Sequence, residues 1–182
     1  MAQTNQIRLD SARDSLLVPV DFSECSRSAL IYASRLVEGT STPLLLLHVI
    51  HDDVRRPGLY RNHDSYRMAR PITDVAAEML ESMLSGLRHQ NPELRTLQAA
   101  STLLVSGLPG RRIVEVAQHE QASMIIMGTH GRNGFAHMLQ GSVAEYVTKH
   151  AGMPVMTIKN NNIVPASLNL AGLGKTAVPV GV

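Results

Sequence analysis

The chain has 182 residues, which is enough for one domain with a sizeable hydrophobic core. Seventeen Lys and Arg against fifteen Asp and Glu leave a formal charge of +2, which argues against a densely basic surface for nucleic acid. Cys25 is the only cysteine, so an internal disulfide is excluded and a reducing cytoplasm is expected. Residues 1–15 lack the apolar core of a signal peptide, and no apolar run approaches the roughly 20 residues of a membrane helix.

The first part of the chain predicts a strand, a helix and a second strand. The apolar run at 16–20 is the first strand, and Ser23 can cap a helix that ends before Gly39. The run at 43–50, "PLLLLHVI", has the continuous apolar character of a strand that is covered on both faces. The inner face of the helix would carry Ala29, Leu30, Ala33, Leu36 and Val37.

Residues 51–70 carry many charges without a period, which predicts an exposed flap. Its arginines at 55, 56, 61, 67 and 70 are either a solvated cluster or a group that reaches phosphate or an acidic partner. Apolar residues then repeat every three or four positions over 71–90, the strongest helical pattern in the chain. The remaining elements expected are a strand within 97–105, a helix that begins near Pro109, a strand at 123–127, a helix at 142–150 and a strand at 153–159.

Five strands that alternate with four helices predict an α/β fold, an open, mostly parallel, Rossmann-like sheet with helices on both faces. We expect an N-terminal extension at 1–13, one domain at 14–159 and a C-terminal tail at 160–182. The tail contains "GLGKT" at 172–176, but a phosphate-binding P-loop would need glycine where this chain has Asn169.

A glycine-rich stretch after the fourth expected strand is the best candidate for a ligand site. Ligands of open α/β sheets bind beyond the carboxyl ends of the strands. Gly128 and Gly131 would let backbone amides take positive φ angles and approach a ligand, and Gly141 and Ser142 open a helix whose N-terminus favours an anion. A second interpretation needs no ligand, because Ser142 and Glu145 have the spacing of a capping box.

The spacing of this stretch resembles a known family. Gly128, two residues, Gly131, nine residues and then Gly141-Ser142 match the pattern of the ATP-binding subgroup of the universal stress protein family. "LLVPVDFSECSRSAL", "LLLLHVI", "MIIMGTHG" and "GMPVMTIK" resemble the strands and turns of that family, so the likeness covers roughly residues 14–159.

The resemblance implies a sheet of order 3-2-1-4-5, a homodimer formed through the last strand from Met153 to Lys159, and ATP or another adenine nucleotide, with or without Mg, across the strand ends. It implies nucleoside contacts from the first turn and from the Val49 backbone, and phosphate contacts from the glycine stretch. The nucleotide-binding residues implied are Pro19, Val20, Asp21, Val49, Met127, Gly128, Gly131, Arg132, Asn133, Gly141, Ser142 and Val143. Val20 is a departure, because ATP-binding relatives often carry threonine there.

Two functions remain open at this point. The first is a dimeric, nucleotide-dependent regulator of the stress response, and the alternative is a slow ATPase or a nucleotidyl- or phosphoryl-transfer enzyme. Hydrolysis usually needs a metal with carboxylate support, and Asp21 is the one acidic residue placed near the site. We therefore predict no catalytic residues, and no metal site because the histidines lack helical ligand spacing.

Overall fold

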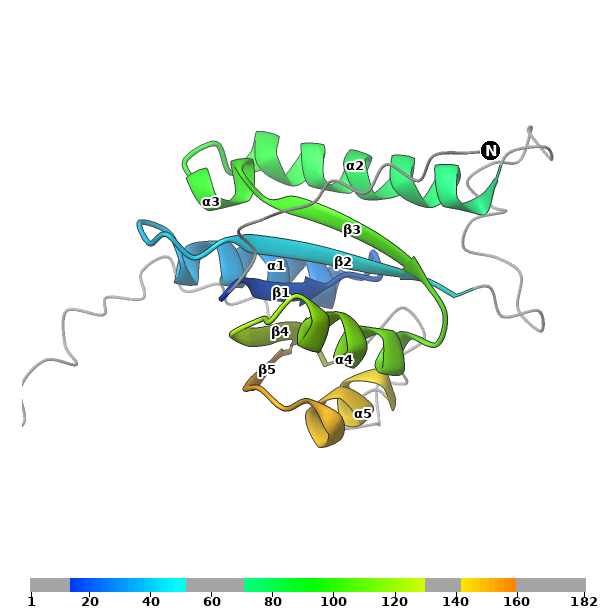
Figure 1. The fold of residues 1–182 in the computed structure, drawn as a ribbon. Coiled ribbons are helices and arrows are strands. Elements are labelled where there is room, and N and C mark those ends of the chain that lie inside the picture. Colours follow the sequence, from blue (N-terminus) through cyan, green and yellow to red (C-terminus); the bar gives the residue numbers. More distant parts are fainter. Residues whose placement is uncertain (1–13, 52–70, 130–141, 160–182) are drawn as a thin grey trace, which may run out of the picture.

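The computed structural model describes residues 14–51, 71–129 and 142–159. Its strands form one sheet in the order β3-β2-β1-β4-β5, and every neighbouring pair is parallel (Figure 1). The predicted α/β fold and the implied strand order are thus confirmed. The strands are β1 (Leu16–Pro19), β2 (Leu44–Ile50), β3 (Ser101–Ser106), β4 (Met124–Gly128) and β5 (Val155–Ile158).

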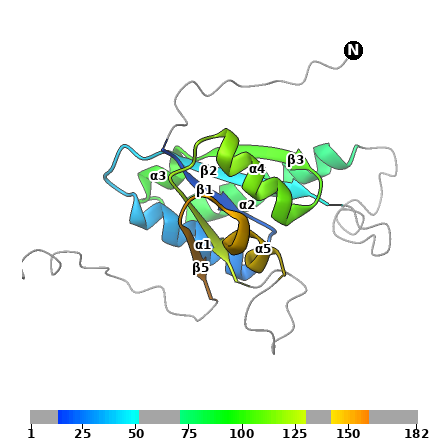
Figure 2. The ribbon, with the colours of Figure 1, turned by 60° about the horizontal axis from the view of Figure 1, so that its bottom comes forward.

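Helices cover both faces of this sheet, as the alternating pattern predicted (Figures 1 and 2). One face carries the first three helices and the other carries the last two. Residues 1–13, 52–70, 130–141 and 160–182 lie outside the description, so the domain boundaries, the flap and the tail stay predictions. The helices are α1 (Glu24–Leu36), α2 (Ile72–Gln90), α3 (Arg95–Gln98), α4 (Pro109–His119) and α5 (Ser142–His150).

The short helix α3 is a correction to the sequence analysis, which expected four helices and placed a strand within 97–105. The carboxylate of Glu38 accepts hydrogen bonds from the backbone amides of Arg95 and Thr96, both at 3.1 Å. These bonds satisfy two amides at the start of α3 and hold the pKa of Glu38 below its usual value. The capping group comes from a residue 57 positions away, so no local pattern could have indicated it.

The start of α1 follows the prediction closely. Ser23 is its N-cap, and the Ser23 hydroxyl accepts a hydrogen bond from the Ser26 amide at 3.2 Å. The helix is followed by Gly39 at a φ of +80°, a conformation that favours glycine. This cap lies in the turn after β1 and fixes where α1 begins, which matters for the candidate site described below.

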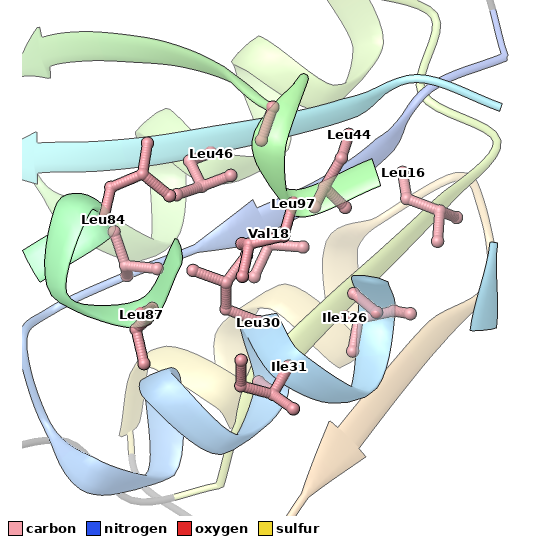
Figure 3. Close-up of a cluster of buried hydrophobic side chains, with 14 of the residues drawn as sticks. Leu16, Val18, Leu30, Ile31, Leu44, Leu46, Leu84, Leu87, Leu97 and Ile126 are labelled. Carbon is pink, nitrogen blue, oxygen red and sulfur yellow. The ribbon is translucent and has the colours of Figure 1, made fainter. Parts of the chain in front are cut away.

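The core is divided by the sheet into two clusters. Figure 3 shows the cluster on the α1 and α2 side, where side chains at even positions of β1 and β2 meet the two helices. Odd positions of the same strands, such as Leu17 and Leu47, pack against α4 and α5 instead. Both faces of β1 and β2 are therefore buried, which explains their continuous apolar sequences. Among the described helices, none is both long and apolar enough to cross a lipid bilayer.

Leu30 offers a test of this packing, because it is fully buried between α1 and the sheet (Figure 3). Leu30→Ala should lower the free energy of unfolding by about 2–5 kcal/mol, through lost burial and the cavity it leaves. The matched control is Leu108→Ala, since Leu108 is 62% exposed and its change should stay within about 0.5 kcal/mol. Chemical denaturation of both variants measures the difference, and equal losses would contradict this core assignment.

Candidate functional site

The sheet opens between β1 and β4. Strand order reverses there, because the chain continues from β1 to β2 and β3 on one side and from β4 to β5 on the other. In open α/β sheets such a switch point is where ligands bind, beyond the carboxyl ends of the strands. The two strands are in register only at Leu16↔Met124 and Leu17↔Ile125.

Pro19 explains why the pairing stops. The Ser15 carbonyl accepts a bond from Ser123, so odd positions of β1 direct their backbone groups toward β4. Pro19 is the next odd position after Leu17, and proline has no amide hydrogen to donate. The ladder to β4 loses a donor at this point, while the opposite edge of β1 stays paired with β2 through Pro19↔Leu47. The gap at the strand ends therefore follows from the missing amide hydrogen of one residue, Pro19.

Asp21 lies directly after this gap, half-buried in the turn between β1 and α1. Its Oδ1 accepts hydrogen bonds from the Ser23 amide at 3.1 Å and from the Ser23 hydroxyl at 2.5 Å. The Asp21 amide donates to the hydroxyl of Ser26 at 3.3 Å. The carboxylate is therefore held in one orientation by the turn that caps α1, which suits a group that must meet a ligand in a fixed geometry.

Val20 is less available to a ligand than the resemblance implies. Its side chain is 4% exposed and belongs to the core cluster under α1 and α2. Its amide donates to the Leu47 carbonyl at 2.8 Å, and its carbonyl accepts from His48 Nδ1 at 2.7 Å. A threonine here would add a hydroxyl to a buried residue. The backbone amide and carbonyl of that residue are already hydrogen-bonded within the chain.

Val49 differs from Val20 in that its backbone groups face the candidate site. The Leu47 carbonyl accepts from the amide of Val20, the residue after β1, so odd positions of β2 direct their backbone groups toward β1. Val49 is the next odd position, and it lies past Pro19, the last residue of β1. Its amide and carbonyl therefore face the region that Asp21 borders, which is the arrangement expected of a backbone contact to a ligand.

Gly128 does not have the positive φ angle that the sequence analysis expected of it. Among the described glycines, positive φ angles occur at Gly39 and Gly107 and not at Gly128, which ends β4 in extended backbone. A Cβ built on Gly128 would lie 2.8 Å from the Cβ of Cys25 and 2.9 Å from its carbonyl carbon. Glycine is required here so that the first turn of α1 can pack against β4, and this brings the helix N-terminus to the gap. Met127, just before it, is 5% exposed and packs in the α4 and α5 cluster.

The far side of the predicted site is only partly described. Ser142 is exposed and is the first residue of α5, and the residue before it lies outside the described part of the chain, so the predicted capping box is not tested. Val143 follows it and is half-buried. Four predicted contacts, Gly131, Arg132, Asn133 and Gly141, lie outside the described residues.

His48 is a buried polar residue of this site that the sequence analysis did not single out. It is 2% exposed, and because its Nδ1 meets a carbonyl oxygen, that nitrogen must carry the proton. The imidazole also lies against the ring of Phe22, with 4.5 Å between ring centroids. Burial lowers the pKa of His48, although the Val20 carbonyl and the charge of Asp21 oppose that shift. Within the described ranges, no three His, Cys, Asp or Glu side chains gather closely enough for a metal ion.

These features define a doubly wound α/β protein with a candidate binding region at its switch point. A model of the family described as "Universal stress protein family" matches residues 12–159, and the chain belongs to that family. One universal stress protein of Methanocaldococcus jannaschii is 45% identical over 144 residues, covering 79% of this chain and 81% of that protein. A second from the same organism is 27% identical over 160 residues, covering 81% and 95%.

Solved structures agree with this fold. The structure of the second archaeal protein superposes with a TM-score of 0.59 at 27% identity, covering 84% of this chain and 99% of that one. A universal stress protein from Lactobacillus plantarum gives a TM-score of 0.61 at 24% identity, covering 80% and 97%, which supports the fold alone.

The buried imidazole predicts a loss of stability in mild acid. The unfolded chain protonates His48 near pH 6.5, whereas the folded chain does so only at lower pH. The stability that neutral His48 confers is therefore complete above about pH 6.5 and is lost as the pH falls through the lowered folded pKa. Urea unfolding at a series of pH values measures this, with His48→Asn as the non-titrating control. The prediction is wrong if the two proteins lose stability in parallel.

Proposed function

We propose that this chain is an ATP-binding universal stress protein that works in the cytoplasm as a homodimeric, nucleotide-dependent regulator of the stress response. The observation that carries the proposal is the opening at Pro19, with the fixed carboxylate of Asp21 on one side and Gly128 on the other. Gly128 is the first glycine of the spaced pattern that continues to Ser142. The described part of the site thus coincides with the start of the predicted phosphate-binding segment.

The groups present suit the parts of ATP. The Asp21 carboxylate offers acceptor oxygens for ribose hydroxyls, and the Val49 backbone offers a donor and an acceptor for the edge of adenine. The first turn of α5, with Ser142 and Val143, would meet the far phosphates, where a helix N-terminus favours negative charge. Bound ATP would supply a polyphosphate whose presence changes the surface that partner proteins meet. Pro19 and Met127 would border the nucleoside, and Gly131, Arg132, Asn133 and Gly141 would complete the phosphate contacts.

Structures of related proteins support an adenine nucleotide as the class of ligand. One universal stress protein has been described in complex with cAMP, and it superposes with a TM-score of 0.52 at 21% identity. A universal stress protein from Archaeoglobus fulgidus has been described in complex with dAMP, with a TM-score of 0.52 at 23% identity. Each shares the fold with this chain, and both ligands carry the adenine base that the Val49 backbone would read.

Binding is favoured over turnover by the way Asp21 is used. Its Oδ1 already accepts two hydrogen bonds from Ser23, which fixes the carboxylate as a positioned acceptor. A general base would need the reactive oxygen to be directed at a water beside the γ-phosphate, and within the described residues no three His, Cys, Asp or Glu side chains gather to hold a metal ion. The enzyme alternative would be favoured instead by steady phosphate release at about 1 per second or faster.

The ATP proposal is tested by thermal melts with and without nucleotide. At a hundredfold excess over Kd, ATP should stabilise the wild type by about 2.7 kcal/mol. Gly131→Val should abolish this shift, because a β-branched side chain blocks the close backbone approach to phosphate. Ser142→Ala should lose part of the shift, since it removes one hydroxyl and leaves the helix amides in place.

The matched control is Gly86→Val in α2, where an added Cβ would meet no atom within 4 Å. This variant should keep the full ATP shift. Equal shifts in all four proteins would mean that the glycine stretch is only a loop, and no shift in the wild type would refute ATP binding.

The proposed dimer follows from the position of β5. It is the last strand of the sheet (Figure 1), and each of its residues is half-buried. Met156 and Ile158 direct their backbone groups to β4, so those of Val155 and Thr157 face the outer edge. An edge strand with apolar side chains and outward amides is a template for pairing with a second copy.

Thr157→Pro tests this edge directly. Proline removes one outward amide hydrogen and leaves the ladder to β4 intact, so the variant should fold but run as a monomer. Thr157→Val keeps the amide and nearly the same shape, and it should remain dimeric like the wild type. Light scattering at micromolar concentration distinguishes the two states. A monomeric wild type, or a dimeric Thr157→Pro, would argue against pairing through β5.

A further inference from the structure

The turn between β1 and α1 holds an unfavourable backbone conformation. Phe22 has a φ of +64°, which is rare for a bulky residue without a glycine's freedom. Such a conformation persists only where surrounding contacts impose it. The residues on either side of Phe22 are Asp21 and Ser23, the pair that forms the proposed ribose contact and its support. Whatever holds Phe22 in place therefore also places Asp21.

The contacts around Phe22 converge on His48. The imidazole packs on the Phe22 ring at 4.5 Å between centroids, and its Nδ1 donates to the Val20 carbonyl at 2.7 Å. One side chain of β2 thus touches the turn at two successive places, once before Asp21 and once after it. The bond to Val20 is buried, so water cannot replace it without cost, and the Phe22 ring is half-buried against the imidazole.

The bond to Val20 has a second consequence, which follows from the hydrogen-bond ladder. In a continued parallel ladder, the Val20 carbonyl would accept from the amide of Val49. Among the described residues, the donor to this carbonyl is instead His48 Nδ1. The side chain takes the place of a backbone amide, and the Val49 amide stays outside the β1–β2 ladder, on the side that faces the gap.

We infer that His48 is a positioning residue that sets both halves of the nucleoside site, by holding the turn that carries Asp21 and by keeping the Val49 amide out of the ladder. This inference rests on the proposed function. The ligand class it concerns is a purine ribonucleotide with free ribose hydroxyls, since those hydroxyls are what a fixed carboxylate recognises. Because His48 is 2% exposed, its proposed role is to act through Asp21 and Val49.

Two substitutions separate the donor from the ring. His48→Phe keeps an aromatic ring against Phe22 and removes the donor to Val20. His48→Asn loses the ring and keeps an N–H in nearly the position of Nδ1. If the donor is what positions the site, the phenylalanine variant should show the defect and the asparagine variant should largely retain wild-type behaviour. His48→Leu, which also lacks a donor and is smaller than a ring, replaces His48→Phe if that protein does not fold.

The first measurement uses nucleotide-free protein, so it does not depend on ATP binding. Residue-resolved amide hydrogen exchange of His48→Phe should show faster exchange at Asp21 and Ser23, by about tenfold for the loss of one buried bond. The Val49 amide should exchange more slowly than in the wild type, because it can now pair with the Val20 carbonyl. General destabilisation would speed exchange at all three amides, so slower exchange at Val49 is specific to this role.

The second measurement compares the affinities of ATP and 2′,3′-dideoxy-ATP, which lacks both ribose hydroxyls. The wild type and His48→Asn should bind ATP about tenfold more tightly than the dideoxy compound, the value of a hydrogen bond to a charged group. In His48→Phe both compounds should bind more weakly, because the Val49 amide is lost to their common adenine base. The ratio should fall to near one, because only ATP also loses the contact of its ribose hydroxyls with Asp21.

The outcomes of the two measurements are distinct. A wild type that binds neither nucleotide would refute the proposed function, and the exchange data would then decide the structural part alone. A wild type that discriminates while His48→Phe discriminates equally would overturn the inference. Faster exchange at Val49 in His48→Phe would overturn it as well, because it would mean that the Val49 amide does not pair with the Val20 carbonyl when the His48 donor is removed.

Discussion

The absence of one amide hydrogen, at Pro19, is the constraint on which the candidate site depends. Parallel strands pair as long as each can donate and accept along the shared edge. Pro19 is positioned so that its missing donor faces β4, while the opposite edge of β1 remains paired with β2. The sheet keeps its five strands and its buried core, and it opens only at the carboxyl ends of β1 and β4. A proline elsewhere on β1 would have weakened the sheet without making a gap at this place.

The gap is a candidate site because α1 begins beside it and β4 ends at it. Gly128 lets α1 approach β4 closely, so the first turn of α1 and the Asp21 turn lie at the opening. Ser23 serves both structures, as the cap of α1 and as the hydrogen-bond partner of Asp21. Shared residues of this kind couple stability to function, because a change that loosens the helix start also releases the carboxylate.

The sequence predicted most of the fold for a simple physical reason. Strands that are covered on both faces read as continuous apolar runs, and helices that are covered on one face read with a period of three to four residues. Both signals are local, and α1, α2, α4 and α5 were recovered from them. The exception is α3, whose first amides are capped by Glu38. That residue lies in the connection between α1 and β2. Nothing near residues 95–98 in the sequence reports that carboxylate.

The site was predicted less completely, and the reason differs from residue to residue. The spacing from Gly128 to Ser142 identified the family, but the structure gives Gly128 a packing role in place of a positive φ angle. His48 lies within an apolar run, and a single polar residue there predicts no role from sequence. Its role becomes visible only with its contacts to the Val20 carbonyl and the Phe22 ring. By itself the sequence determined the elements, their order along the chain and the spacing of the glycines, since these depend on residues near one another. Only the tertiary structure decided which backbone amides the ladder uses and which it leaves facing the gap, because that depends on how strands far apart in sequence come into register.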